Sequence, residues 1–130
     1  MAIRVTTGLG HLEGLERDGV RIFRGVPFAK PPVGERRFRA PEKPEPWTGV
    51  RDATSYGAAA HQPPLMLAAL PGFDIGPQSE DCLFLNVYTP NGASPSNRKP
   101  VMVWIHGGAF VIGAGSQSIY EATRLARRGD

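Results

Sequence analysis

The chain has 130 residues, a formal net charge of +3 and a hydrophobic fraction of 41%. This composition excludes a disordered chain, and the length corresponds to one small domain or to part of a larger one. The basic residues are scattered, apart from a group at Arg36, Arg37 and Arg39. Because nucleic-acid binding typically shows a basic stripe interleaved with aromatic residues, we expect no nucleic-acid partner.

Cys82 is the single cysteine, so no disulfide can form within the chain. The sequence favours a buried, unpaired Cys82, with a reactive thiol as the alternative. The first residues, "MAIRVTTGLGHLEG", lack the apolar core of a secretory signal, and no apolar run is long enough to cross a bilayer. We therefore expect a cytoplasmic protein without a membrane partner.

The N-terminal part predicts short antiparallel strands. "IRVTT" and "HLEGLE" alternate weakly, and Asp18 and Gly19 separate "LEGLER" from "VRIFRGV". An Asp-Gly pair between apolar runs is typical of a two-residue β-hairpin turn. The sequence therefore predicts a hairpin at this pair.

Two irregular stretches follow. Residues 26–47 contain six prolines, which forbid regular secondary structure. The apolar residues Phe28, Val33, Phe38 and Trp47 recur within this stretch, which indicates an ordered loop pinned by their burial. Residues 57–79 are interpreted as a second loop, in which "LMLAAL" is a candidate for a helical turn.

Two strands are predicted next. Residues 82–89, "CLFLNVYT", alternate with Leu83, Leu85 and Val87 on one face. Residues 101–106, "VMVWIH", are apolar on both faces, as expected of a strand covered on both sides in a largely parallel sheet. We expect that these two strands can pair with each other.

A short helix is predicted after residue 118. Ser118 and Glu121 match a capping box. The helix pattern is completed by an apolar stripe, a basic last turn and a glycine stop, at Ala122, Leu125, Ala126, Arg127, Arg128 and Gly129. In a parallel sheet this helix should return to another strand, so we expect the front end of a larger fold or one piece of a two-piece protein.

A glycine turn follows the predicted strand 101–106 directly, with the sequence His106, Gly107, Gly108, Ala109, Phe110. Glycines allow backbone N–H groups to approach a ligand closely, and acyl-transfer enzymes need such donors where a carbonyl oxygen becomes an oxyanion. In α/β-hydrolases an HGGG-type loop supplies part of the oxyanion hole. The alternative is an ordinary glycine-rich strand exit.

Three long motifs occur in register: "FRGVPFAKPPVGERRFRAPEKPEPWTGVRDATSYG", "SEDCLFLNVYTP" and "KPVMVWIHGGAFVIGAG". Together they resemble the N-terminal part of the type-B carboxylesterases. The resemblance implies an α/β-hydrolase fold, with small antiparallel strands leading into a central, mostly parallel sheet. Residues 1–130 would then be the N-terminal segment of a single domain. It also implies a serine hydrolase that acts on small carboxylic esters and needs no cofactor.

The resemblance also implies roles for the glycine turn. The oxyanion donors fall at Gly108 and Ala109, with Gly107 in the same hole, and Ala109 replaces the third glycine of the usual motif. Phe110 would line the pocket and contact substrate. His106 would support the loop through hydrogen bonds, since the triad of these hydrolases follows this region in the order Ser, acid, His.

The nucleophile elbow of the family, G-x-S-x-G, is absent from the sequence. None of the serines has that context: Ser55, Ser79, Ser94, Ser96, Ser116 and Ser118. We therefore expect the catalytic Ser, acid and His on a complementary C-terminal segment, and no ester hydrolysis by this chain alone. The alternative is a non-catalytic, esterase-like binding or adhesion protein.

In the same family the Glu of "SEDCL" forms a buried ion pair with an Arg of the proline-rich loop, which implies a pair between Glu80 and Arg37. Many secreted members pair the Cys of this motif with an upstream Cys, near whose position His61 stands here. His11 and His61 have no second ligand at metal-binding spacing, so no metal is expected. Residues 8–14, "GLGHLEG", miss the dinucleotide-binding motif by one position.

Overall fold

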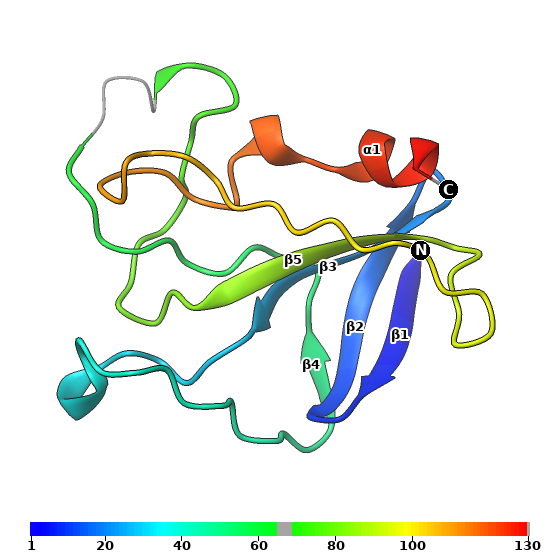
Figure 1. Cartoon of the computed structure of the whole chain (residues 1–130), viewed down its shortest axis with the longest axis horizontal. Helices are drawn as coiled ribbons and strands as arrows, with labels where there is room; N and C mark the ends of the chain where they lie inside the picture. Colours follow the sequence, from blue (N-terminus) through cyan, green and yellow to red (C-terminus); the bar gives the residue numbers. More distant parts are fainter. Residues whose placement is uncertain (65–68, 130) are drawn as a thin grey trace.

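The computed structural model describes residues 1–64 and 69–129 (Figure 1). Their strands, in chain order, are β1 (Ala2–Thr7), β2 (Gly10–Arg17), β3 (Val20–Pro27), β4 (Val50–Asp52) and β5 (Phe84–Pro90). Their helical segments are η1 (Gly34–Arg36), η3 (Ser118–Tyr120) and α1 (Thr123–Arg128). The helical turn considered for residues 65–70 lies largely outside the described residues.

The described strands form one five-stranded sheet in the order β1-β2-β3-β5, with β4 beside β2. The path from β1 to β5 is antiparallel throughout. Only β4 is parallel to its neighbour, with Val50–Asp52 opposite residues 11–13 of β2 (Figure 1). This sheet matches the small antiparallel strands predicted for the N-terminal part.

The turn between β2 and β3 confirms the predicted hairpin. Asp18 and Gly19 have φ angles of 54° and 77°, so both occupy the left-handed region that a type I′ turn requires. Asp tolerates this region better than most residues, and Gly enters it without a Cβ penalty. The local sequence alone therefore determines this connection.

The main apolar cluster lies where β2 and β3 meet the chain after β4. Leu12, Phe23 and Ala53 form its buried centre, and Trp47 is one of the partly buried residues packed against it. The Trp47 indole donates a hydrogen bond to the His11 carbonyl at 2.9 Å. The end of the proline-rich loop is thereby attached to β2.

The other three residues that were predicted to pin the proline-rich loop are not buried, so that part of the prediction was wrong. Phe28 and Val33 are exposed, and Phe38 is 99% exposed with a φ of 58°. The irregular backbone was predicted correctly, with η1 as its single helical turn in the described residues. The exposed apolar residues of this loop form a surface that no described part of the chain covers.

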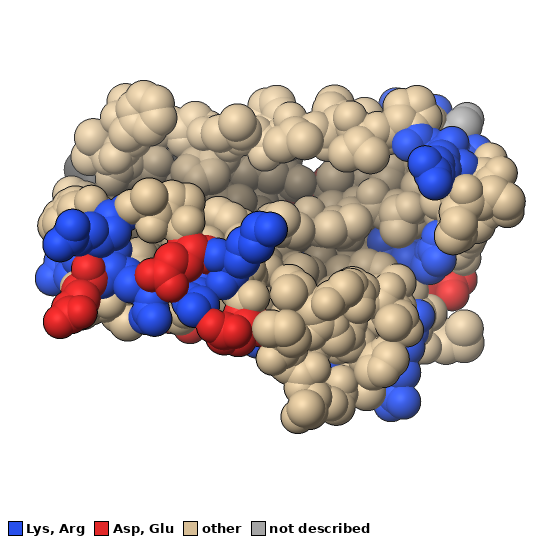
Figure 2. All heavy atoms as spheres, turned by 60° about the horizontal axis from the view of Figure 1, so that its bottom comes forward, with Lys and Arg blue, Asp and Glu red and all other residues tan. Residues whose placement is uncertain are grey.

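Ion pairs link the two arms of the loop. Lys30 contacts Glu42 at 3.3 Å and Glu45 at 2.5 Å, and Arg36 contacts Glu42 at 3.3 Å. Hydrogen bonds to Glu45 and Glu42 raise the pKa of the Lys30 ammonium. Figure 2 shows positive and negative side chains gathered together at one end of the face that it draws.

Residues 101–106 form no strand, so the prediction of a doubly buried strand was wrong for this structure. The stretch is extended coil, drawn in yellow in Figure 1. Residues 101–105 are between 63% and 87% exposed, and β5 pairs with β3 rather than with this stretch. A strand that is apolar on both faces is stable only where other segments cover both faces, and no described segment does so for residues 101–105.

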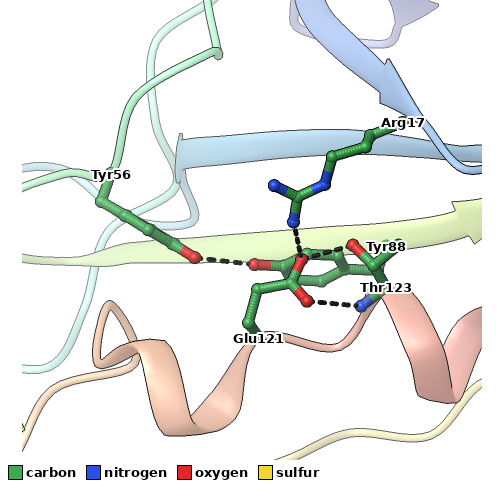
Figure 3. Close-up of polar contacts among 5 residues, drawn as sticks. All are labelled: Arg17, Tyr56, Tyr88, Glu121 and Thr123. Carbon is green, nitrogen blue, oxygen red and sulfur yellow. Dashed lines mark hydrogen bonds and ion pairs between the residues drawn. The ribbon is translucent and has the colours of Figure 1, made fainter. Parts of the chain in front are cut away.

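The predicted helix is also different in detail. Ser118 makes no capping hydrogen bond, and α1 begins only at Thr123. The Glu121 carboxylate does not reach back to the Ser118 N–H, because it accepts hydrogen bonds from Arg17 of β2 at 2.9 Å and from the Thr123 backbone N–H at 3.2 Å (Figure 3). The helix does stop at Gly129, as predicted.

Glu121 thereby attaches the helical end of the chain to the sheet. Burial raises the pKa of this carboxyl, but hydrogen bonds from the Thr123 hydroxyl and backbone, together with the charge of Arg17, bring the pKa below its ordinary value. In the same close-up, the Tyr56 and Tyr88 hydroxyls share a 2.8 Å hydrogen bond (Figure 3). No helix among the described residues is long and apolar enough to span a membrane.

Candidate active site

The glycine turn is a compact loop between the extended stretch 101–105 and η3. The N–H groups of Val111 and Ile112 both donate to the Gly108 carbonyl, at 3.0 and 3.1 Å. Gly108 has a φ of 126°, and a Cβ on it would lie 1.8 Å from the Ile112 carbonyl oxygen. Glycine is therefore required at this position by both backbone angle and space.

The next two residues are held in an unfavourable conformation. Ala109 and Phe110 have φ angles of 54° and 61°, in the left-handed region that residues with a Cβ rarely adopt. Each such residue costs about 1–3 kcal/mol, and such strain is concentrated at active sites and ligand clamps. The observed strain makes this turn a candidate functional element.

Four consecutive backbone donors in the turn are unused. Within residues 1–64 and 69–129, the N–H groups of Gly107, Gly108, Ala109 and Phe110 donate no hydrogen bond. Adjacent N–H groups without an acceptor can donate to one anionic oxygen, which is the requirement at an oxyanion hole. This run includes Gly107, Gly108 and Ala109, whose role as oxyanion donors stays a prediction.

His106 contacts the turn that follows it. Its Nδ1 donates to the Gly107 carbonyl at 2.8 Å, which places the proton on Nδ1 because a carbonyl oxygen only accepts. A Cβ on Gly113 would lie 2.8 Å from the same Nδ1, so the ring also fills the space beside the far end of the turn. The supporting role expected for His106 stays a prediction.

Phe110 is fully exposed, so it lines no pocket within the described residues. Its role as a substrate contact remains a prediction. Ser116, the serine nearest to the turn, donates its hydroxyl hydrogen to the Ile75 carbonyl at 3.2 Å. That hydroxyl is engaged in holding the backbone, which agrees with its sequence context.

Arg37 and Glu80 do form an ion pair, with 3.2 Å between Nε and Oε1. The expected burial is wrong, because the two side chains are 56% and 39% exposed. Solvent screens a pair of this kind, so its contribution to stability is about 0–1 kcal/mol. The pair links η1 to the "SEDCL" motif without a buried charge.

Cys82 is a free, half-buried thiol. Burial raises its pKa, and the charges of Asp81 and Glu80 add to this effect. A raised pKa lowers the thiolate fraction, which disfavours the reactive alternative. Among the described residues no group of three or more His, Cys, Asp or Glu side chains could hold a metal ion.

Sequence reasoning missed Gln62, which holds the far end of the turn. Its Oε1 accepts from the Gly113 N–H at 2.7 Å, and its Nε2 donates to the Gly113 carbonyl at 3.0 Å. These residues are 51 positions apart, and nothing local in the sequence marks the pair. Asn86 was missed as well, although the sequence carries a signal for it: it is a polar residue between Phe84 and Tyr88 on one face of β5, and such a residue needs a partner.

The sequence and fold comparisons agree with one another. The model of the carboxylesterase family matches residues 2–130. The para-nitrobenzyl esterase of Bacillus subtilis is 50% identical over 126 residues, which cover 97% of this chain and 25% of that enzyme. The phenmedipham hydrolase of Pseudarthrobacter oxydans is 47% identical over 126 residues, which cover 95% of this chain and 25% of that enzyme.

Solved structures show the same relationship. A thermophilic para-nitrobenzyl esterase superimposes with a TM-score of 0.82 at 48% identity, over 95% of this chain and 25% of that one. A carboxylesterase of Geobacillus stearothermophilus gives 0.84 at 44% identity, over 98% of this chain and 24% of that one. The chain thus spans about a quarter of the length of these relatives. It belongs to the carboxylesterase family, and its fold is that of the N-terminal portion of an α/β-hydrolase.

Proposed function

We propose that this chain supplies the oxyanion-hole loop of a serine carboxylic-ester hydrolase. The supporting observation is the run of unused N–H groups that includes Gly108 and Ala109, in a strained turn of a carboxylesterase-family chain. Gly107 belongs to the same loop and leaves its outer side open, since a Cβ on it would meet nothing within 4 Å. A carbonyl oxygen of substrate therefore has room to approach.

The reaction proceeds in two steps. A serine, activated by a histidine that an acid orients, attacks the ester carbonyl and gives a tetrahedral oxyanion. The N–H groups of Gly108 and Ala109 stabilise this oxyanion, and the residue after the nucleophile supplies a third donor. The intermediate collapses to an acyl-enzyme and releases the alcohol, and water then releases the acid.

The catalytic Ser, acid and His belong, in this proposal, to a complementary C-terminal segment, because the sequence contains no G-x-S-x-G. The chain and this segment would together complete one domain. The exposed apolar side chains of residues 101–105 support this, since a soluble protein rarely leaves such a continuous stretch uncovered. The segment's strands would flank residues 101–106 and turn them into the predicted interior strand.

The substrate we propose is a small carboxylic ester. The similarity to a para-nitrobenzyl esterase supports an ester with an aromatic alcohol, and Phe110 would contact it once the pocket is assembled. No cofactor is required, because the steps need only a nucleophile, a base and oxyanion donors. The lone cysteine suits a reducing compartment such as the cytoplasm.

The test is hydrolysis of para-nitrophenyl acetate by three samples: the 130-residue chain, the unmatched part of the Bacillus subtilis para-nitrobenzyl esterase, and their mixture. We expect turnover only in the mixture, from a heterodimer seen by size-exclusion chromatography. Replacing the nucleophile serine of the complement by alanine is the control. Turnover by the chain alone would contradict the proposed position of the nucleophile, and an assembled heterodimer without turnover would favour the non-catalytic alternative.

A further inference from the structure

Three consecutive residues at the end of the glycine turn are each held by an amide side chain from a different place in the chain. Gln62 binds both backbone groups of Gly113. The Ala114 N–H donates to the side chain of the buried Gln117 at 3.4 Å. Asn86 of β5 donates to the carbonyl of the next residue, Gly115, at 3.1 Å.

Gln62 makes two of these hydrogen bonds, whereas Gln117 and Asn86 make one each. It donates to and accepts from the same residue, which fixes both the position and the tilt of the Gly113 peptide groups. Its own position is also fixed, because its backbone N–H donates to Gln78 Oε1 at 2.9 Å and its Nε2 also reaches the Ala60 carbonyl at 3.1 Å. The amide is therefore oriented before it contacts the turn.

Gly113 is the place where the two ends of the turn meet. A Cβ on Gly113 would lie 2.7 Å from the Gly107 carbonyl oxygen and 2.8 Å from His106 Nδ1. Gly113 also follows directly on Ile112, whose N–H closes the turn on the Gly108 carbonyl. A displacement of Gly113 therefore changes both ends of the segment that carries the unused N–H groups.

From this geometry we infer that Gln62 is a positioning residue for the oxyanion-hole loop. It touches neither substrate nor nucleophile, and acts by holding Gly113 so that the N–H groups of Gly108 and Ala109 keep a common direction. The inference rests on the proposed function. Misplacing a catalytic group by 1 Å can cost about 10²-fold in rate. A residue that fixes the position of the donors can therefore affect the rate without contacting the reacting atoms.

The first test measures how strongly Gln62 protects the Gly113 N–H, by amide hydrogen exchange of the full 130-residue chain. Gln62→Met keeps the length of the side chain and removes both hydrogen bonds. We expect exchange of the Gly113 N–H to accelerate by at least about tenfold. Asn91→Leu is the control, because it removes an amide side chain that donates to Glu16 and is hydrogen-bonded to neither Gln62 nor Gly113. Unchanged exchange at Gly113 in Gln62→Met would overturn the inference.

The second test measures the consequence, in the heterodimer with the complement described above. Per active site titrated with a phosphonate, we expect Gln62→Met to lower kcat by about 10- to 100-fold with KM within about twofold. Gln62→Glu keeps the acceptor for the Gly113 N–H and should give an intermediate kcat. A residue that only stabilised the fold would reduce the number of titrated sites and leave kcat per site unchanged, which would overturn the inference.

The two tests separate this inference from the proposed function. An unmutated heterodimer without turnover would contradict the proposed function, and the exchange measurement would still decide whether Gln62 holds the turn. An active heterodimer with equal kcat in the unmutated and Gln62→Met forms would leave the proposed function standing and overturn the inference alone.

Discussion

Gly108→Ala is the substitution that tests the shape of the turn most severely. A methyl group at residue 108 would lie 1.8 Å from the Ile112 carbonyl oxygen, whereas real Cβ atoms essentially never come within 3.0 Å of such an atom. The turn must therefore open by roughly 1 Å, a displacement that can cost about 10²-fold in rate at an active site. Loss of one oxyanion donor costs about 2.7–4 kcal/mol of barrier, about 10²–10³ in kcat.

We therefore expect Gly108→Ala to lower kcat for para-nitrophenyl acetate in the heterodimer by about 10²–10³. The φ of 126° adds strain, so the variant should also unfold more easily, by about 1–3 kcal/mol. The neighbouring Gly107→Ala is the matched comparison. Its methyl group would meet nothing within 4 Å and its φ lies outside the left-handed region, so its kcat should fall by less than about tenfold. Equal kcat values for the two variants would refute the reasoning.

Three further predictions concern the fold of the chain itself. Arg37→Ala and Arg36→Ala each break an exposed ion pair, so urea unfolding should show both within about 1 kcal/mol of the unmutated chain; a much larger loss for Arg37→Ala would indicate a buried pair. The folded-state pKa of Glu121 is lowered, so its carboxylate stabilises the fold above its ordinary pKa and this stabilisation is lost as pH falls through the folded-state pKa. Thermal unfolding between about pH 3 and pH 7 should therefore depend less on pH in Glu121→Gln, and an unchanged profile would contradict this. Tyr88→Phe removes a 2.8 Å hydrogen bond and should cost about 0.5–1.5 kcal/mol. Burial raises the pKa of Tyr88, so an absorbance titration should lose one late-ionising tyrosine in that variant.

Local signals predicted the connections of the fold well. The Asp18-Gly19 turn needs only two residues with left-handed φ angles, and the sequence provides them. The alternation predicted a strand over residues 82–89, and the structure has it over Phe84–Pro90. Such features depend on residues that are neighbours in the chain, so they can be predicted without knowledge of the packing.

Predictions that depended on burial were less successful. Residues 101–105 and Phe38 are apolar and yet exposed. An apolar sequence indicates that a segment is stabilised by burial, but it does not show whether another part of the chain covers that segment. The same reason explains the Arg37–Glu80 pair, whose partners were predicted correctly and whose burial was not.

The candidate site was predicted in part. The glycine motif indicated Gly108 and Ala109, and the structure adds that their N–H groups are unused within the described residues and that the backbone there is strained. The contact of the Gln62 side chain with the Gly113 backbone could not be predicted, since it joins residues 51 positions apart through a single side chain. Contacts of this kind depend on the tertiary arrangement and leave no periodic pattern in the sequence.

The central claim is that the Gly108 and Ala109 N–H groups bind the oxyanion. It can be measured by labelling this chain with ¹⁵N in a heterodimer with the unlabelled complement, and adding a phosphonate that reacts with the nucleophile serine. Hydrogen bonding to the phosphonate oxygen should move the amide proton resonances of Gly108 and Ala109 downfield, while that of Gly92, in a distant turn, stays in place. Resonances of Gly108 and Ala109 that do not move on complete inactivation would contradict the account.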